Sequence, residues 1–212
     1  IGGGLTGVST ALSLSEKGLN VCLFEAGSIG DGGSGRNGGQ ICQGWSTNFE
    51  KLLKYIDPKL QQDMWLTGIE GPPLIKDRIE KYNIDCDVQW GYVHTAIHKG
   101  HMRELDDYQR RFEQRGYSQL TALPDKSSLF NYICSDAYIG GLYDSGSGHL
   151  HPLKYLIGLA KAATKAGTHI YTNSPISSIQ TTKHTNKLIT ENGLIISACL
   201  LYTSDAADEE AG

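Results

Sequence analysis

The sequence predicts an α/β fold that begins with a parallel βαβ unit and is interrupted by an α+β insertion. Three observations support this fold class: a glycine pattern at the start, helical and then strand-like apolar spacing after it, and a helix followed by short strands near the end. The expected ranges are 1–82 for the first part of the α/β domain, 83–138 for the start of a substrate-facing insertion, 139–198 for the second part of the α/β domain, and 199–212 for a non-native tail.

The glycine pattern is a dinucleotide-binding signature. Gly2, Gly4 and Gly7 satisfy G-x-G-x-x-G. The first glycine of this pattern permits a tight strand-to-helix turn, the second lets the backbone approach a pyrophosphate, and the third lets the helix pack closely on its strand. The phosphates would lie at the N-terminus of the helix that follows. Because the chain holds 26 glycines, the pattern needs support from its surroundings.

The residues after the motif provide that support. Apolar residues recur at helical spacing from Leu5 to Leu12, and Gly18 is placed to end the helix. Residues 19–24 then read as a buried parallel strand, which is followed by Glu25. A carboxylate there can accept hydrogen bonds from both hydroxyls of an adenosine ribose, which favours an unphosphorylated ribose over NADP. The alternative is an ordinary βαβ unit with a glycine-rich turn.

A second glycine-rich stretch follows at residues 26–40, where seven of fifteen residues are glycine. A flexible linker is the simple alternative. An Arg-Asn pair between glycines, directly after a ribose-binding acid, favours a loop that cradles a cofactor. Ser34, Arg36 and Asn37 would supply hydrogen-bond donors in this loop.

The middle of the chain has a different pattern. Residues 49–82 predict a helix–turn–helix with its break at Gly71-Pro72-Pro73, residues 86–98 a half-buried strand or hairpin, and residues 102–116 an amphipathic helix. Residues 138–152 read as a turn-rich stretch that leads into a helix.

The last elements predict a return to the α/β domain. A helix is expected over 152–166, with Pro152 at its start and Gly167 after its end. Short strands follow at 168–172 and 174–181. A strand pair within 188–198 is joined at Asn192-Gly193, a strong hairpin signal.

Composition excludes several classes of protein. The formal net charge is −4, and it becomes 0 without the four acidic residues at 205–210. A neutral chain without basic clusters lacks the positively charged surface that nucleic-acid binding requires. No apolar run is long enough to span a bilayer. Cys22, Cys42, Cys86 and Cys134 form no C-x-x-C pair, so reduced thiols and a cytoplasmic location are expected.

No metal site and no catalytic residue is predicted. His94, His98 and His101 have suggestive spacing, but they fall on a predicted strand and a predicted helix and need not converge. His149 and His151 precede a helix, where contact with a cofactor or substrate and a capping or packing role are equally open.

Both ends of the chain suggest truncation. Ile1 reads as the last residue of the first strand, so we expect that earlier residues are missing. Residues 199–209 resemble the read-through translation of a sequencing-library adapter, and residues 199–212 are therefore expected to be no part of the fold.

Two further runs carry a family resemblance. Residues 34–40 read Ser-Gly-Arg-Asn-Gly-Gly-Gln, and residues 148–152 read Gly-His-Leu-His-Pro. With the first motif and Glu25, these runs make residues 1–198 similar to the FAD-dependent D-amino-acid-oxidase superfamily. Within it, the chain most resembles the gamma-glutamylputrescine oxidoreductases.

The resemblance implies a glutathione-reductase-type, FAD-binding Rossmann-like domain, with FAD rather than NAD as cofactor. It implies that Gly2, Gly4 and Gly7 meet the pyrophosphate, that Glu25 binds the adenosine ribose, and that the backbone of Ile176 meets the adenine. The following residues would run toward the phosphates and the isoalloxazine: Ser34, Gly35, Arg36, Asn37, Gly38 and Gly39. In some relatives with covalent flavin a histidine occupies the Asn37 position, so its absence argues against attachment there.

The resemblance also implies a reaction. Such enzymes oxidise the C–N bond of an amine or amino acid by hydride transfer to the flavin, and oxygen or another acceptor then reoxidises the cofactor. Because the family's second half is not in this chain, the chain alone is expected to be inactive. The alternatives are C–O oxidation, as in hydroxy-acid or glycerol-phosphate dehydrogenases, an FAD domain of an RNA-modifying enzyme, and a non-catalytic nucleotide-binding module.

Overall fold

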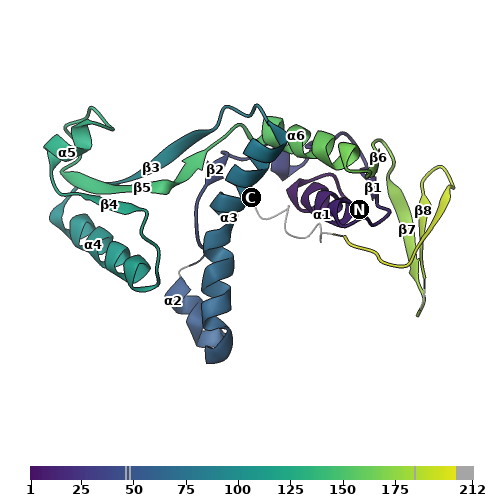
Figure 1. The fold of residues 1–212 in the computed structure, drawn as a ribbon, viewed down its shortest axis with the longest axis horizontal. Helices are drawn as coiled ribbons and strands as arrows, with labels where there is room; N and C mark the ends of the chain where they lie inside the picture. The colour runs from purple at the N-terminus through teal and green to yellow at the C-terminus, as the bar shows by residue number, and fades with distance from the viewer. Residues whose placement is uncertain (46, 48, 184, 204–212) are drawn as a thin grey trace. The chain divides into compact units, whose positions relative to one another are not determined.

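The computed structural model describes residues 1–45, 47, 49–183 and 185–203, and they form two compact units (Figure 1). The first unit combines Ile1–Gly39, Arg78–Asp87 and the described residues from 151 onward. The second combines Gln40–Asp77 with Val88–Leu150, apart from residues 46 and 48. These boundaries differ from the ranges 1–82, 83–138 and 139–198, and the assignment of those ranges to FAD-binding and substrate-facing domains stays a prediction.

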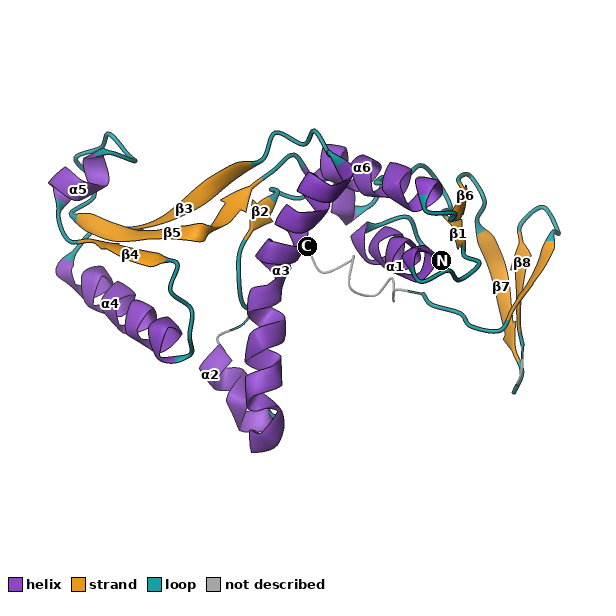
Figure 2. Cartoon of the chain, viewed as in Figure 1, coloured by secondary structure: helices purple, strands orange, loops and turns teal. Residues whose placement is uncertain are grey.

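The first unit has the α/β architecture that the sequence predicts (Figure 2). Strand β1 (Cys22–Phe24) pairs in parallel with β6 (His169–Tyr171), and the backbone N–H of Gly2 donates to the carbonyl of Phe24 at 2.8 Å. Helices α1 (Leu5–Glu16) and α6 (Pro152–Lys165) pack against one another. Their buried faces include Val8, Leu12, Leu156 and Leu159.

The ends of α1 and α6 confirm their sequence signals. Gly18 and Gly167 follow the two helices with φ of +79° and +106°, the left-handed region that favours glycine. The strand after α1 is shorter than the predicted 19–24. The N–H of Leu19 bonds back to the carbonyl of Leu14 at 3.2 Å. Residues 17–19 therefore close the end of α1, and the strand begins only at Cys22.

The hairpin near the end is also confirmed. Strands β7 (Ile176–Thr181), β8 (Asn186–Thr190) and β9 (Ile195–Ala198) form an antiparallel sheet in that order. Gly193 lies in the turn between β8 and β9 with φ of +84°. Of the tail expected at 199–212, residues 204–212 lie outside the described residues.

A four-stranded antiparallel sheet organises the second unit. The long strand β5 (Gly140–His149) pairs with β3 (Gln89–Ala96) along one edge, and with β2 (Gln40–Ile41) and β4 (Leu120–Leu123) along the other. The prediction of a turn-rich stretch at 138–152 is therefore wrong. Its glycines allow close strand packing instead. A Cβ at Gly141 would lie 2.5 Å from the His94 carbonyl oxygen.

The predicted break at Gly71-Pro72-Pro73 is also wrong, because α3 (Gln61–Tyr82) runs through it. Pro72 has no N–H for the carbonyl four residues earlier. That carbonyl, on Gly68, accepts a hydrogen bond of 2.7 Å from the N–H of Gly44 instead. The turn lies ahead of α3, after the short helices α2 (Phe49–Leu52) and η2 (Leu53–Tyr55) and before η3 (Pro58–Leu60).

Helix α4 (Lys99–Gln114) starts earlier than the predicted residue 102, and a short α5 (Lys126–Phe130) follows β4. The Nδ1 atom of His98 accepts hydrogen bonds from the N–H groups of Gly100 and His101 and so caps α4. Within the described ranges, no helix is both long enough and apolar enough to cross a membrane.

Candidate functional site

The glycine turn at the start of α1 has the geometry that its sequence pattern requires. Gly2 has a φ of +97°, in the left-handed region. A Cβ at Gly7 would lie only 2.0 Å from the carbonyl oxygen of Gly2. Residue 7 therefore must be glycine for α1 to approach the turn this closely.

Glu25 connects this turn to the glycine-rich loop that follows it. One carboxylate oxygen accepts from the Gly3 N–H at 2.5 Å, and the other accepts from the Gly27 N–H at 2.9 Å. The carbonyl of Glu25 accepts from the Ser174 N–H at 2.9 Å. Glu25 thus lies where the glycine turn, the loop and the segment leading into Ile176 meet.

Ser34 brings the second glycine-rich segment onto the N-terminus of α1. It lies in the short helix η1 (Gly33–Gly35), and its hydroxyl accepts a hydrogen bond of 3.0 Å from the Leu5 N–H. Gly4 faces the same side chain, because a Cβ at Gly4 would lie 2.8 Å from Ser34 Oγ. The group that approaches the Gly4 backbone closely in the structure is therefore the Ser34 side chain.

The side chain of Asn37 forms hydrogen bonds with the backbone of its own loop. Its amide nitrogen donates to the carbonyls of Gly33 at 3.2 Å and Ser34 at 3.0 Å, and its amide oxygen accepts from the Gly39 N–H at 2.8 Å. Both amide hydrogens are used inside the loop, so Asn37 holds the loop's shape. Arg36 is exposed, and its guanidinium forms no ion pair with any residue that the structure describes.

The N-terminus of α1 suits a phosphate group. The first intrahelical bond runs from the Val8 N–H to the Gly4 carbonyl at 3.0 Å. The N–H groups of Thr6 and Gly7 precede it and have no acceptor among the described residues, and the helix dipole adds partial positive charge there. Backbone donors beside a carboxylate, on a turn that only glycine can form, are the donor set that a dinucleotide requires.

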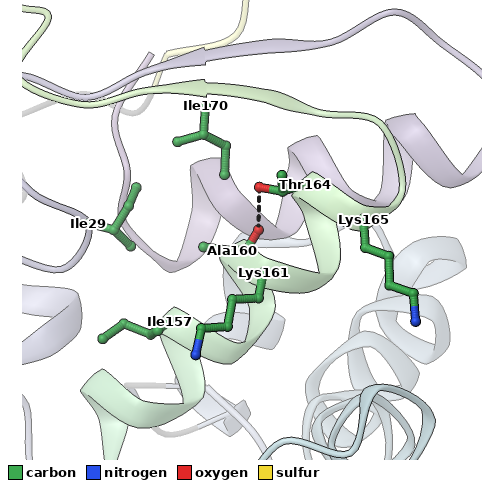
Figure 3. A pocket seen from close by; sticks show the side chains of 7 residues that line it. All are labelled: Ile29, Ile157, Ala160, Lys161, Thr164, Lys165 and Ile170. Atoms are coloured by element: carbon green, nitrogen blue, oxygen red, sulfur yellow. Dashed lines mark hydrogen bonds between the residues drawn. The ribbon is translucent and has the colours of Figure 1, made fainter.

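A hollow of the first unit lies apart from these residues. Figure 3 shows Ile29 and Ile170 facing α6 across it, and its volume is about 490 Å³. Its walls are largely apolar. The hydroxyl of Thr164 is bonded to the Ala160 carbonyl at 3.0 Å. None of the predicted cofactor residues lines this hollow.

The second unit contains a buried polar network that sequence reasoning missed. Asp144, on β5, is fully buried, and its carboxylate accepts from the Tyr117 hydroxyl at 2.7 Å, the Gly146 N–H at 2.9 Å and the Ser147 hydroxyl at 2.7 Å. Burial, together with this carboxylate, raises the pKa of Tyr117 well above its ordinary value. Burial lowers the pKa of His94, and Asp144 partly opposes that shift.

Comparisons with known proteins show which family the chain belongs to. The sequence profile of the family described as "FAD dependent oxidoreductase" matches residues 1–206. The chain is 35% identical over 206 residues to a probable oxidoreductase OrdL of Haemophilus influenzae, covering 97% of this chain and 48% of that protein. It is 36% identical over 182 residues to the gamma-glutamylputrescine oxidoreductase of Escherichia coli, covering 86% of this chain and 42% of that protein.

A solved structure shows the same fold. Glycine oxidase from Geobacillus kaustophilus superposes with a TM-score of 0.72 at 21% identity, over 93% of this chain and 51% of that one. The chain belongs to the family of FAD-dependent oxidoreductases, whose cofactor is FAD. It spans about half the length of the curated relatives it matches.

Proposed function

We propose that the protein oxidises the C–N bond of an amine or amino acid, with a substrate similar to gamma-glutamylputrescine. The family supports oxidoreductase chemistry with FAD, and the name of the E. coli relative supports an amine bearing a glutamyl group. The observation that carries the cofactor part is the N-terminus of α1, which lies beside both Glu25 and Ser34.

The proposed cofactor contacts follow from this arrangement. The backbone around Gly2, Gly4 and Gly7 would bind the pyrophosphate, Glu25 the adenosine ribose, and the backbone of Ile176 the adenine. The loop that would continue toward the phosphates and the isoalloxazine comprises Ser34, Gly35, Arg36, Asn37, Gly38 and Gly39. Its shape is set in advance by the side chain of Asn37.

When bound, FAD would supply the hydride acceptor of the reaction. The residues of this chain contribute binding and orientation. The N–H groups at the start of α1 offset phosphate charge. Glu25 spans the turn and the loop, so its position ties the ribose site to the phosphate site. The five cysteines are free thiols, which supports the proposed cytoplasmic location.

Two alternatives use the same cofactor module. C–O oxidation would be expected of a hydroxy-acid or glycerol-phosphate dehydrogenase, and a non-catalytic module would bind the nucleotide without turnover. The test is anaerobic mixing of the purified whole protein with gamma-glutamylputrescine, with glycine and with glycerol 3-phosphate, while flavin absorbance is followed. Loss of oxidised flavin absorbance with an amine supports the proposal. Loss of this absorbance with glycerol 3-phosphate alone would overturn the proposal. Unchanged absorbance with all three compounds would also overturn it.

The electron acceptor is tested in the same preparation. Readmission of air to the reduced protein should restore the oxidised spectrum quickly if oxygen is the acceptor. Slow recovery in air, with rapid recovery on addition of a quinone, would identify a dehydrogenase instead.

A further inference from the structure

The second unit contains a pocket of about 310 Å³ between the segment after β2 and helices α3 and α4. Helix α4 contributes one face to it, with Tyr108, Arg111, Phe112 and Arg115. These residues have i, i+3, i+4 and i+7 spacing, so their side chains share one side of the helix.

The walls of the pocket are aromatic and packed. Trp65 is 2% exposed, and its indole N–H donates to the Arg115 carbonyl at 3.0 Å. Its ring meets Phe112 edge-on with centroids 4.9 Å apart, and Phe112 stacks on Tyr108 at 4.2 Å. A surface of this kind suits a short methylene chain. Binding there removes the apolar area of the chain from water, and a methylene chain has no polar group that needs a hydrogen-bond partner.

Two hydrogen-bond donors of α4 remain for a ligand. Gln43 donates its amide hydrogen to the Tyr108 hydroxyl at 3.2 Å, so the phenolic hydrogen of Tyr108 has no acceptor among the residues the structure describes. Burial, with Asp144 adding to the effect, raises the pKa of Tyr108, and the phenol therefore keeps that hydrogen at neutral pH.

The second donor is Arg111. The other arginine of the pocket, Arg115, forms an ion pair with Glu50 at 3.0 Å and lies over the rings of Phe49 and Trp65. Arg111 forms no ion pair with any described residue. Among the described residues that line the pocket, Arg111 is therefore an arginine without an ion pair, three residues from a phenol donor on one helix face.

We propose that this pocket binds the carboxylate end of a short aliphatic ligand, with Tyr108 and Arg111 as donors to the carboxylate and Trp65 and Phe112 against the methylene chain. The proposal stands on the pocket alone and does not depend on flavin chemistry. The carboxylate could belong to the substrate or to a separate ligand, and the experiments below distinguish the two.

The direct test uses glutarate as the probe, with its uncharged diamide as the comparison. Trp45 and Trp65 both line the pocket, so intrinsic fluorescence of the whole protein reports binding without turnover. We expect glutarate to change the fluorescence saturably and glutaramide to bind at least tenfold more weakly. Absence of a saturable change with glutarate would overturn the proposal.

Arg111→Met should weaken glutarate binding at least about tenfold, the size of one charge-assisted hydrogen bond. Arg110→Met is the matched control, because it removes the same charge from the neighbouring position, where Arg110 pairs with Asp107 away from the pocket. Tyr108→Phe keeps the ring and should weaken binding about threefold to tenfold. Equal losses in the two arginine variants would show a long-range charge effect and contradict the site.

Steady-state kinetics then identify the source of the carboxylate. If it belongs to the substrate, Arg111→Met raises KM for a carboxylate-bearing amine and leaves KM unchanged for an amine without one. If it belongs to a separate ligand, both KM values stay unchanged while glutarate binding is still lost. Because binding is read by fluorescence, failure of amine oxidation would leave this test intact.

Discussion

The Gly3 N–H donates to one carboxylate oxygen of Glu25, and this contact joins the two glycine-rich segments at the candidate cofactor site. The second oxygen of Glu25 accepts from Gly27. The carboxylate therefore has a structural task in addition to its proposed contact with the ribose.

Glu25→Gln should weaken FAD binding about tenfold or more. The amide places an NH₂ group opposite one of two backbone donors, and an unpaired polar group of this kind costs about 1–3 kcal/mol. The measurement is flavin affinity of the apoprotein by fluorescence quenching. Asp31→Asn is the matched control, because Asp31 accepts from the Ser28 N–H on the exposed side of the same loop. Similar losses in both variants would contradict a specific role for Glu25.

Gly7→Ala should lower both stability and flavin content. The added Cβ would lie 2.0 Å from the Gly2 carbonyl oxygen, so α1 must move away from the turn. Overpacking of this kind costs about 1–3 kcal/mol. Thermal unfolding and flavin content are measured on purified protein, with Gly33→Ala as the control because a Cβ there meets open space. Wild-type values for Gly7→Ala would refute the close approach.

Tyr117→Phe should destabilise the second unit by about 1.5–3 kcal/mol, because it removes a donor from a fully buried carboxylate. Ser147→Ala should have a similar effect, since the Ser147 hydroxyl lies 2.7 Å from the same group. Denaturant unfolding of both single variants and the double variant measures their coupling. Strictly additive losses would indicate that the two hydroxyls do not share Asp144 as a partner.

His94 should make the protein less stable as the pH falls. Its pKa is lowered in the folded state by burial, so the unfolded chain binds a proton first, near the ordinary pKa of about 6.5. Stability contributed by neutral His94 is complete above that pH and is lost below it, as the pH falls toward the folded pKa. His94→Gln should flatten this slope in denaturant unfolding between pH 7 and pH 5, values chosen to bracket the ordinary histidine pKa. The exposed His149, changed to Gln, serves as control, and an unchanged slope in His94→Gln would exclude its contribution.

The sequence correctly predicted the helices and the hairpin whose ends are marked by glycine or Asn-Gly. Gly18 and Gly167 end their helices, and Asn192-Gly193 turns the hairpin, because each signal acts within a few residues. The contacts of Glu25 with Gly3 and of Ser34 with Leu5 bring the two glycine-rich runs together. The sequence predicted contacts of both side chains with the cofactor, and it did not predict these contacts within the chain.

Other features depend on contacts between distant residues. The glycines of β5 resemble a turn until β3 and β4 are placed beside them. The pocket at Tyr108 and Arg111 left only a weak signal, the i, i+3 spacing on an amphipathic helix. Its opposite wall comes from Trp65 and from residues 43–45, 47, 49 and 50, and no local pattern links those segments.

Pro72 has a consequence for how this region tolerates replacement. Alanine is ordinarily the most favourable residue in a helix interior, so Pro72→Ala would be chosen as a stabilising change. Here it would introduce an N–H that competes with Gly44 for the Gly68 carbonyl. Because Gly44 lines the pocket, this proline leaves free an acceptor that holds one residue of the pocket wall.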